Sequence, residues 1–285
     1  MTAMHLIGLA IQLSMALIIF CVALNASFGD VLFLWRRPSL LVRSLVSMLV
    51  VMPVFVLALA LWFDLNHAVM VALLASAMSP VPPILPNKQI KAGGEQSYVV
   101  GLLTTTALVS IAYVPLVAAL LGDAFQRPID VSIANIVRIV ATSMLLPVLL
   151  GMAVHRWAPA LAKRIERPLS IVATVVLVAA CIPIVLKEWP EMQRLIGHFS
   201  LLVMVAFALV GLGVGHWLGG PDPDERSVLA MATSARHPAV ALTIAHNAID
   251  KPGVMAAVLL ALIVASIVAA PYVKWRQRSR APAPA

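Results

Sequence analysis

An arginine and a histidine stand next to each other within an otherwise apolar stretch of this chain. Arg236 and His237 interrupt residues 225–248 and are followed by Pro238. An arginine inside hydrocarbon costs about 3 kcal/mol, so it is normally paired or faces a watery cavity, and it marks a functional site by default. Its guanidinium either grips a substrate carboxylate through two parallel hydrogen bonds or stands where a coupling cation would bind.

His237 adds a group whose charge changes near neutral pH. Arg236 and His237 therefore predict an anion-binding site with a proton-sensitive neighbour. Two structural alternatives stay open. Arg236 could form an ion pair with Glu95 or Glu225, and His237 could merely cap an interrupted helix.

A cluster of prolines interrupts a second apolar stretch, at residues 79–87 with the sequence S-P-V-P-P-I-L-P-N. The prolines that hold this break open are Pro80, Pro82, Pro83 and Pro86. Each proline removes a backbone donor and clashes with the preceding turn, so no continuous helix runs through. Within hydrocarbon the freed backbone groups need protein, water or a ligand, and such a break usually lines a cavity. Asn87 is expected to contact substrate or to cap the segment after the break.

The composition places the chain in a bilayer. Of 285 residues, 62% are hydrophobic and 11% are charged, a balance that no ordinary water-soluble domain of this length shows. The net charge of +8 lies in short loops and a tail, where cations set topology, so nucleic-acid binding is not expected. Cys21 and Cys181 both fall in apolar stretches and indicate neither a disulfide framework nor a metal cluster.

Apolar stretches long enough to cross a bilayer predict an all-α protein with nine transmembrane helices. The expected spans are 5–27, 40–62, 68–95, 97–121, 131–155, 168–187, 198–219, 225–248 and 253–274. The basic loops, among them 155–167 and the tail 276–285, fall on one side if the spans alternate. The positive-inside rule makes that side cytoplasmic, with the N-terminus outside, in a bacterial-type inner membrane.

The two interrupted spans are the third and the eighth. Successive spans cross the bilayer in alternating directions, and these two are five spans apart, so they run in opposite directions. Broken helices at corresponding positions of two halves are typical of an inverted repeat. We expect one transmembrane domain over residues 1–275, with halves at about 5–121 and 168–274 linked by span 131–155. If the breaks cross at the midplane, the N-termini of both second half-helices meet there and favour an anion.

Three glycines share one face of the seventh expected span. Gly211, Gly215 and Gly219 are spaced four residues apart. Small residues at this spacing allow a second helix to approach closely. We expect a packing face here; the spacing does not indicate an oligomer.

Several motifs together resemble the bile acid:sodium symporter superfamily. They are F-C-V-A-L-N-A-S-F-G-D-V-L-F-L-W-R-R-P at residues 20–38, V-V-M-P at 50–53, Ser79-Pro80 with Asn87, A-G-G-E at 92–95, and L-P-V-L-L-G at 146–151. The resemblance covers residues 20–272. It implies panel and core domains with crossed broken helices at the substrate site, and a nine-span member that lacks the first helix of a ten-span plan.

The chain departs from that family where the family's sodium-coupled members have oxygen-bearing side chains. The resemblance aligns Met48, Pro86, Ala232, Arg236 and His237 with those places. Sodium prefers several hard oxygen ligands, so a poor sodium cage is predicted, with at most a weak site at Asn87, Thr104 and Ser110. Coupling to sodium, coupling to a proton through His237, and transport without a coupling ion all stay open.

The expected function is secondary active transport of a small organic anion by alternating access about the crossed breaks. Arg236, His237, Asn87, Thr104 and Thr105 are the expected substrate-binding residues. No phosphate loop, nucleophile elbow or metal-spaced cluster is present in the sequence, so neither an enzyme nor a cofactor is expected. Two rivals are an intramembrane enzyme, with His237 as general base and Glu95 or a threonine as the second group, and a non-transporting sensor.

Overall fold

The computed structural model describes residues 3–63, 65–124, 131–197, 199–248 and 253–279, and these form helices joined by short loops. The first half contains α1 (Ala3–Ala23), α2 (Phe28–Val31), α3 (Pro38–Leu45), η1 (Val46–Val51), α4 (Met52–Trp62), α5 (His67–Met78), α6 (Leu85–Lys91) and α7 (Gln96–Ala124). The second half contains α8 (Ile133–Val140), η2 (Ala141–Leu145), α9 (Leu146–Trp157), α10 (Pro159–Leu195), α11 (Ser200–Leu218), α12 (Pro223–Ser234), α13 (Pro238–Ala248) and α14 (Val254–Arg278).

The chain is an all-α polytopic membrane protein. Within the described residues, 8 helical stretches are long and apolar enough to cross a bilayer, and α5 is a shorter apolar helix. The expected count of nine is not confirmed, because the third expected span consists of α5 and α6 with a non-helical break between them. The eighth expected span is likewise divided into α12 and α13.

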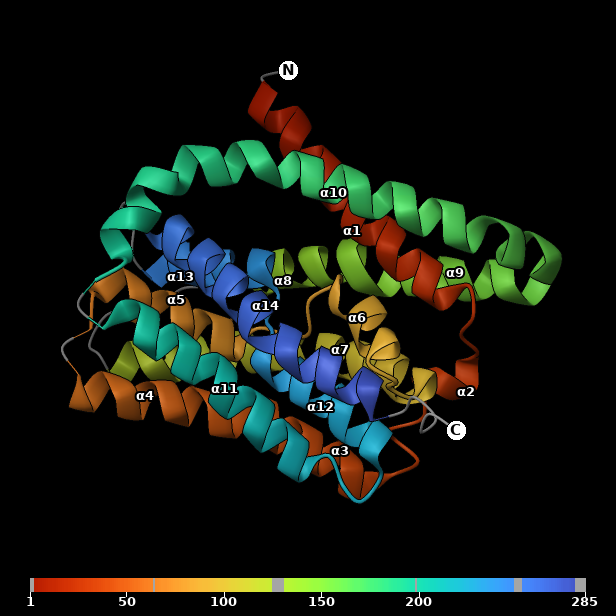
Figure 1. Ribbon diagram of the computed structural model, residues 1–285, viewed down its shortest axis with the longest axis horizontal. Coiled ribbons are helices and arrows are strands. Elements are labelled where there is room, and N and C mark those ends of the chain that lie inside the picture. Colours follow the sequence, from red (N-terminus) through yellow and green to blue (C-terminus); the bar gives the residue numbers. More distant parts are fainter. Residues whose placement is uncertain (1–2, 64, 125–130, 198, 249–252, 280–285) are drawn as a thin grey trace.

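The two broken helices run in opposite directions through the middle of the molecule. In Figure 1, α5 and α13 lie towards the left, whereas α6 and α12 lie towards the right. In the apolar stretch of the span Pro223–Ala248, 72% of the residues are buried inside the molecule, compared with 17% in the apolar stretch of α10. The interior position therefore belongs to a broken helix, and α10 lies at the periphery.

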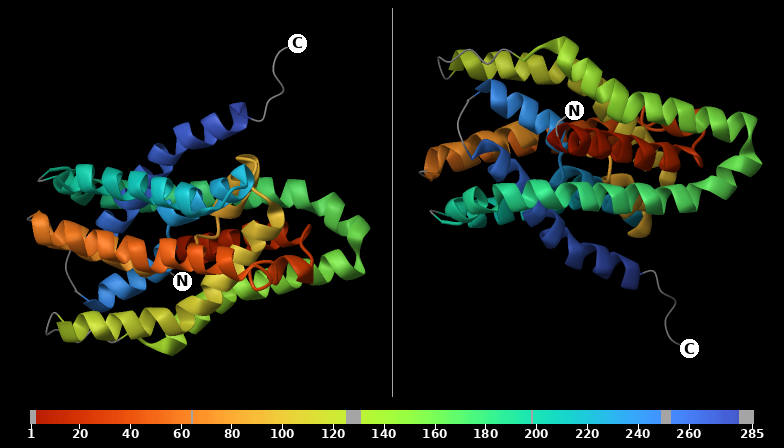
Figure 2. Two further views of the ribbon diagram at one scale, coloured as in Figure 1. Left: turned by 90° about the horizontal axis from the view of Figure 1, so that it is seen from below. Right: turned by 90° about the horizontal axis from the view of Figure 1, so that it is seen from above.

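Helix α10 differs from its prediction in length. The expected loop 155–167 is helical apart from Ala158, which separates α9 from α10. Pro159 sits in the first turn of α10, where proline costs nothing, and three further prolines lie inside the helix. Transmembrane helices tolerate interior prolines, and α10 curves over the body of the molecule while meeting α9 at one end (Figures 1 and 2).

The predicted glycine face packs against α12. A Cβ atom at Gly215 would lie 2.5 Å from the carbonyl oxygen of Leu229, and one at Gly211 would lie 2.7 Å from the Cα of Ser234. A Cβ at Gly219 would meet the Cα of Arg226 at 2.5 Å. Helix α11 therefore lies against the backbone of α12, which fixes the first half of the broken helix.

Two further spans contain a π-helical turn just before a proline. The turn η1 precedes Pro53 in α4, and η2 precedes Pro147 in α9. Proline has no N–H to give to the carbonyls behind it, so these turns leave backbone oxygens without their usual partners. Both turns lie next to the breaks, as described below.

A small hydrophobic cluster lies apart from the main core. It joins Met15 and Ile18 of α1 to Ala173 and Leu177 of α10. The main core contains the buried apolar side chains of most other helices. Helices α1 and α10 thus pack against each other, while the end of α1 also contributes Ile19, Val22 and Ala23 to the main core.

Candidate functional site

The two breaks meet, as the sequence predicts. The amide nitrogen of His237 donates a hydrogen bond to the carbonyl oxygen of Pro80 at 2.9 Å. Helix α5 ends with Ser79 as its C-cap, and α12 ends with Ala235 as its C-cap, both in extended conformation. We call the residues 79–84 and 235–237 the crossing.

Arg236 is buried in the crossing and is held by backbone oxygens. Its side chain is 5% exposed. One terminal nitrogen donates to the carbonyl oxygen of Met48 at 3.0 Å, and the other donates to that of Ser79 at 3.5 Å. Its Nε has no hydrogen-bond partner among the described residues. The guanidinium therefore binds carbonyl groups of two other spans.

The ion pair considered for Arg236 does not form within the described residues. Glu225 instead pairs with Arg37 of the α2–α3 connection. The ion pairs of the described residues involve Arg37, Arg194 and Arg276 as cations, and none involves Arg236. The charge of Arg236 is consequently compensated by carbonyl dipoles alone among the described contacts.

The π-helical turn η1 explains why the Met48 carbonyl is free to bind Arg236. Pro53 lacks the N–H that would bond to Leu49 in an α-helix or to Met48 in a π-helix. The Tyr113 hydroxyl of α7 donates to the Leu49 oxygen at 2.5 Å, and Arg236 donates to the Met48 oxygen. A side chain of α7 and one of the crossing thus replace the donor that proline removes.

His237 is fully buried beside the second π-helical turn. Its Nε2 lies 3.3 Å from the hydroxyl of Ser143 in η2. Ser143 already donates to the carbonyl of Ile139 at 2.6 Å, so Nε2 is assigned as the donor to Ser143. The other ring nitrogen, Nδ1, has no partner among the described residues.

The remaining predicted site residues share no hydrogen bond with one another among the described contacts. Asn87 lies inside α6, whose N-cap is Ile84, so its predicted capping role is wrong; its amide contacts Ser170 of α10 at 3.4 Å. Thr104 and Ser110 donate to carbonyls of their own helix, because a hydroxyl in a helix interior readily bonds one turn back. The buried Thr105 hydroxyl has no partner among the described residues.

Three residues beside the crossing are not predicted as site residues from the sequence. The hydroxyl of Ser47 in η1 lies 2.7 Å from that of Thr233 at the end of α12, and Ser143 contacts His237. A usable signal exists for the serines, since each precedes a proline by four to six residues within an apolar span. No pattern in the sequence indicates which helix each serine faces.

An apolar cavity of about 490 Å³ opens between the crossing and the pair α1–α10. It is lined by Ile11, Met15, Pro82, Pro83, Ile84, Leu177, Val178, Cys181, Ile182, Ile184, Val185, Leu186, Pro238, Ala239, Leu242, Met255, Leu259 and Leu262. None of these side chains carries a charge. The cavity can accommodate an apolar body directly beside both breaks.

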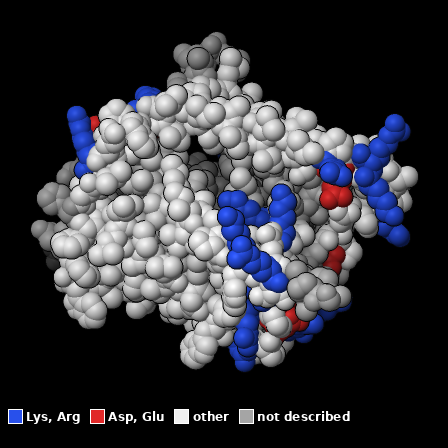
Figure 3. Space-filling view, in the orientation of Figure 1, with Lys and Arg blue, Asp and Glu red and all other residues white. Residues whose placement is uncertain are grey.

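A second cavity, of about 350 Å³, contains three lysines. Lys88 and Lys91 come from α6, and Lys274 comes from α14. Its lining includes Ser234 at the end of α12 and Ala235 of the crossing, and has no acidic residue. Figure 3 shows lysines and arginines clustered beside a hollow in this face, mostly in its right-hand half. We call this the lysine cavity, and this end of the molecule the basic end.

The sodium bile acid symporter family matches the chain over residues 12–190, more than half of its length. The chain belongs to this family. Its resemblance to bile acid:sodium symporters, read from the motifs, is thereby confirmed. The matched residues include the first break and end before α11, so the symporter-family match does not include Arg236 and His237. A search of curated proteins finds no match.

The members of this symporter family are transporters, and the crossing offers little to the rival enzymatic reading. Ser143 does lie within reach of His237, which supplies a second polar group. However, the Nδ1 of His237 has no partner within the described chain, so no carboxylate orients the ring as a catalytic triad requires.

The family name raises the question of a sodium ion, and the residues at this crossing do not fit one. Arg236 already occupies the carbonyl oxygens of Met48 and Ser79. A second cation at the same oxygens would be repelled by the charge of the guanidinium. Asn87, Thr104 and Ser110, the weak alternative predicted from sequence, are not joined to one another by any hydrogen bond found among the described residues.

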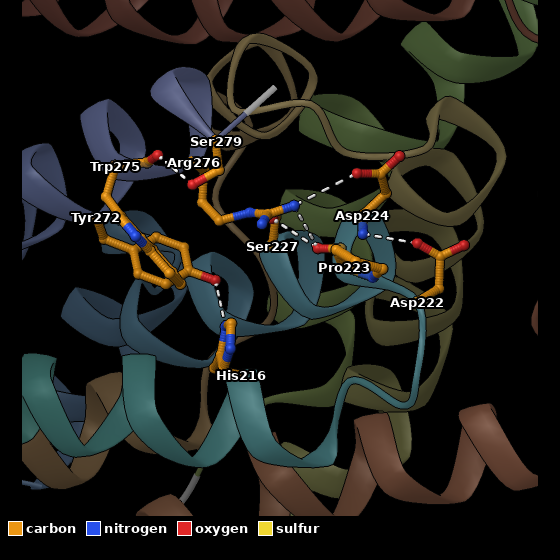
Figure 4. Close-up of polar contacts among 9 residues, drawn as sticks. All are labelled: His216, Asp222, Pro223, Asp224, Ser227, Tyr272, Trp275, Arg276 and Ser279. Atoms are coloured by element: carbon orange, nitrogen blue, oxygen red, sulfur yellow. Dashed lines mark hydrogen bonds and ion pairs between the residues drawn. The ribbon is translucent and has the colours of Figure 1, made fainter. Parts of the chain in front are cut away.

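The first half of the broken span α12–α13 is anchored at the basic end. Arg276 of α14 donates to the Ser227 hydroxyl at 2.6 Å and to the Pro223 carbonyl at 2.8 Å, and it lies 3.4 Å from a carboxylate oxygen of Asp224 (Figure 4). Next to it, His216 of α11 contacts the Tyr272 hydroxyl at 2.8 Å. These bonds join α11, α12 and α14 into one unit next to the lysine cavity.

Proposed function

We propose that this member of the sodium bile acid symporter family is a secondary carrier of organic anions that have an apolar body. The carrier moves them by alternating access about the crossing. The family match supports a symporter-like transporter; the substrate class rests on the two cavities.

The observation that carries the proposal is the junction of the cavities at Leu262. This side chain of α14 lines the apolar cavity, the lysine cavity and a small pocket that also includes Arg236. A molecule with an apolar body and one anionic group would place the body against the prolines of the crossing. Its anionic group would reach the lysines.

The lysine cavity supplies charge without a competing anion. No ion pair of Lys88, Lys91 or Lys274 is found among the described residues, and the cavity lining contains no carboxylate. A cleft lined by charges of one sign concentrates counter-ions within it. We place this end in the cytoplasm by the positive-inside rule, so the cavity is the inner vestibule of the carrier.

Uptake into proteoliposomes tests the proposal. The purified protein is supplied with a steroid carboxylate, a medium-chain fatty acid, a short keto acid and a neutral steroid. We expect uptake of at least one carboxylate with an apolar body, and about tenfold less uptake of the short keto acid and of the neutral compound. Equal uptake of the neutral steroid would refute the requirement for an anion.

Charge removal locates the anionic group. Lys88→Gln, Lys91→Gln and Lys274→Gln are each expected to raise KM about fivefold with a smaller change in kcat, because they weaken binding of the anion. Lys163→Gln removes an exposed lysine of α10 that does not line the cavity, and it should leave KM unchanged. If all four variants behave alike, the lysine cavity is not the anion site.

A further inference from the structure

The crossing contains backbone oxygens of the kind that bind a cation. Helices α5 and α12 both end there, with Ser79 and Ala235 as C-caps. The last carbonyls of a helix lack intrahelical donors and carry about half a negative charge together. Half-helix C-termini and unwound carbonyls are the groups that bind sodium in transporters with broken helices.

The π-helical turn η1 adds a third source of oxygen. The Met48 carbonyl, released by Pro53, lies next to the carbonyl of Ser79, since both accept from one guanidinium. The hydroxyls of Ser47 and Thr233 lie 2.7 Å apart in the adjoining turn and helix end. Carbonyl and hydroxyl oxygens are hard ligands, suited to a hard cation.

This site is filled by a side chain of the protein itself. Arg236 is 5% exposed, and among the described residues it has no carboxylate partner. A buried charge without compensation is strongly destabilising, so the carbonyl oxygens that surround Arg236 are what make its burial tolerable. Conversely, without the guanidinium those oxygens would need another donor or a cation.

We infer that the guanidinium of Arg236 is a built-in cation that occupies the ion site of the crossing, so that this carrier binds no sodium there. The inference goes beyond the proposed function and is independent of which anion is carried. It leads to a gain of function: shortening Arg236 to an uncharged residue uncovers the carbonyl oxygens of Met48 and Ser79 and creates a sodium site.

Thermal unfolding of the purified protein tests the inference without any substrate. The melting temperature is measured in about 300 mM NaCl, KCl or choline chloride, for the wild type and for Arg236→Gln, whose amide oxygen can add a ligand. The wild type is expected to melt at the same temperature in all three salts. The melting temperature of Arg236→Gln is expected to be about 3 °C or more higher in NaCl than in KCl or choline chloride, and to rise with sodium concentration until the site is saturated.

Arg226→Gln is the matched control. It removes the same charge from α12, the half-helix that precedes Arg236, but its side chain bonds to the Gly220 carbonyl and not to the crossing. Its melting temperature should not depend on which cation is present. Arg236→Lys keeps a cation at the site and should likewise ignore sodium.

Sodium-specific stabilisation of the wild type would overturn the inference, and so would an Arg236→Gln protein that melts identically in all three salts. If Arg236→Gln is recovered folded only when purified in NaCl, that result supports the inference; failure to recover it in any salt counts against it. The proposed transport function fails differently, as an absence of anion uptake under every ion gradient.

Discussion

The amide of His237 donates to the carbonyl of Pro80 across 2.9 Å, and this backbone bond joins the two broken helices. The bond lies between a residue next to the charged Arg236 and the first residue of the proline cluster. Any movement of one break relative to the other must therefore break or shift it. The crossing is consequently one of the places where the two halves of the chain are joined.

Leu262 should control passage between the cavities. Leu262→Trp inserts a ring where the apolar cavity, the lysine cavity and the Arg236 pocket adjoin, and we expect it to reduce uptake at least about tenfold. Ile267→Trp, at a side chain 66% exposed on the same helix, is the control and should retain uptake. The measurement is initial uptake in proteoliposomes at equal protein content. Full activity of Leu262→Trp would show that substrate does not pass this junction.

Gly215 should tolerate no side chain. Gly215→Ala places a Cβ 2.5 Å from the Leu229 carbonyl oxygen and 2.6 Å from the Ala230 Cα, so α11 must move away from α12, at a cost of about 2 kcal/mol. Gly213→Ala lies on the same helix with no atom within 4 Å, and it should be neutral or slightly stabilising through helix propensity. The melting temperatures of the two variants, measured by size-exclusion chromatography, distinguish them. Equal melting temperatures would contradict the close packing.

Arg276 should stabilise the start of α12. Arg276→Ala leaves the Ser227 hydroxyl and the Pro223 carbonyl without this donor, and we expect a loss of about 2 kcal/mol, typical of bonds to a charged group. Arg278→Ala removes an equal charge from an exposed position two residues further along α14 and should have little effect. The comparison is made by thermal unfolding in detergent. A larger loss in Arg278→Ala would disprove the anchoring role.

The Asp30 carboxylate should make the stability of the folded protein depend on pH in the acidic range. This carboxylate accepts bonds from the Ser27 amide at 2.6 Å, the Ser27 hydroxyl at 2.8 Å and the Ser97 hydroxyl at 2.5 Å. Partial burial alone would raise the pKa of Asp30, but the bonds from Ser97 and Ser27 outweigh it and lower the pKa below its usual value.

The sign of the effect follows from linkage. A carboxyl group with a lowered pKa in the folded state contributes stability that is present above the unfolded pKa of about 4 and is lost as pH falls through the folded pKa. Asp30→Asn should therefore melt below the wild type at neutral pH, and the gap should close as the pH is lowered below about 4. A gap that stays constant with pH would show that the charge of Asp30 contributes nothing.

The sequence alone determined the features that depend on local composition. Apolar length gave the membrane-spanning character, and the prolines at 79–87 together with Pro238 gave the two breaks, because a missing N–H and a clash with the preceding turn act within a few residues. The odd offset between the third and eighth spans gave their opposite directions. The spacing of Gly211, Gly215 and Gly219 gave a packing face, since residues four apart share one side of a helix.

Only the tertiary structure decided which partners the released polar groups take. Prolines announce that carbonyls are free, but whether the Met48 oxygen binds water, an ion or Arg236 depends on which helices pack beside it. The same holds for Glu225, which pairs with Arg37 rather than with Arg236, and for Asn87, which lies inside α6 instead of capping it. The choice of partner is a long-range property, because it is set by the packing of segments far apart in the chain. Local sequence rules therefore do not predict it.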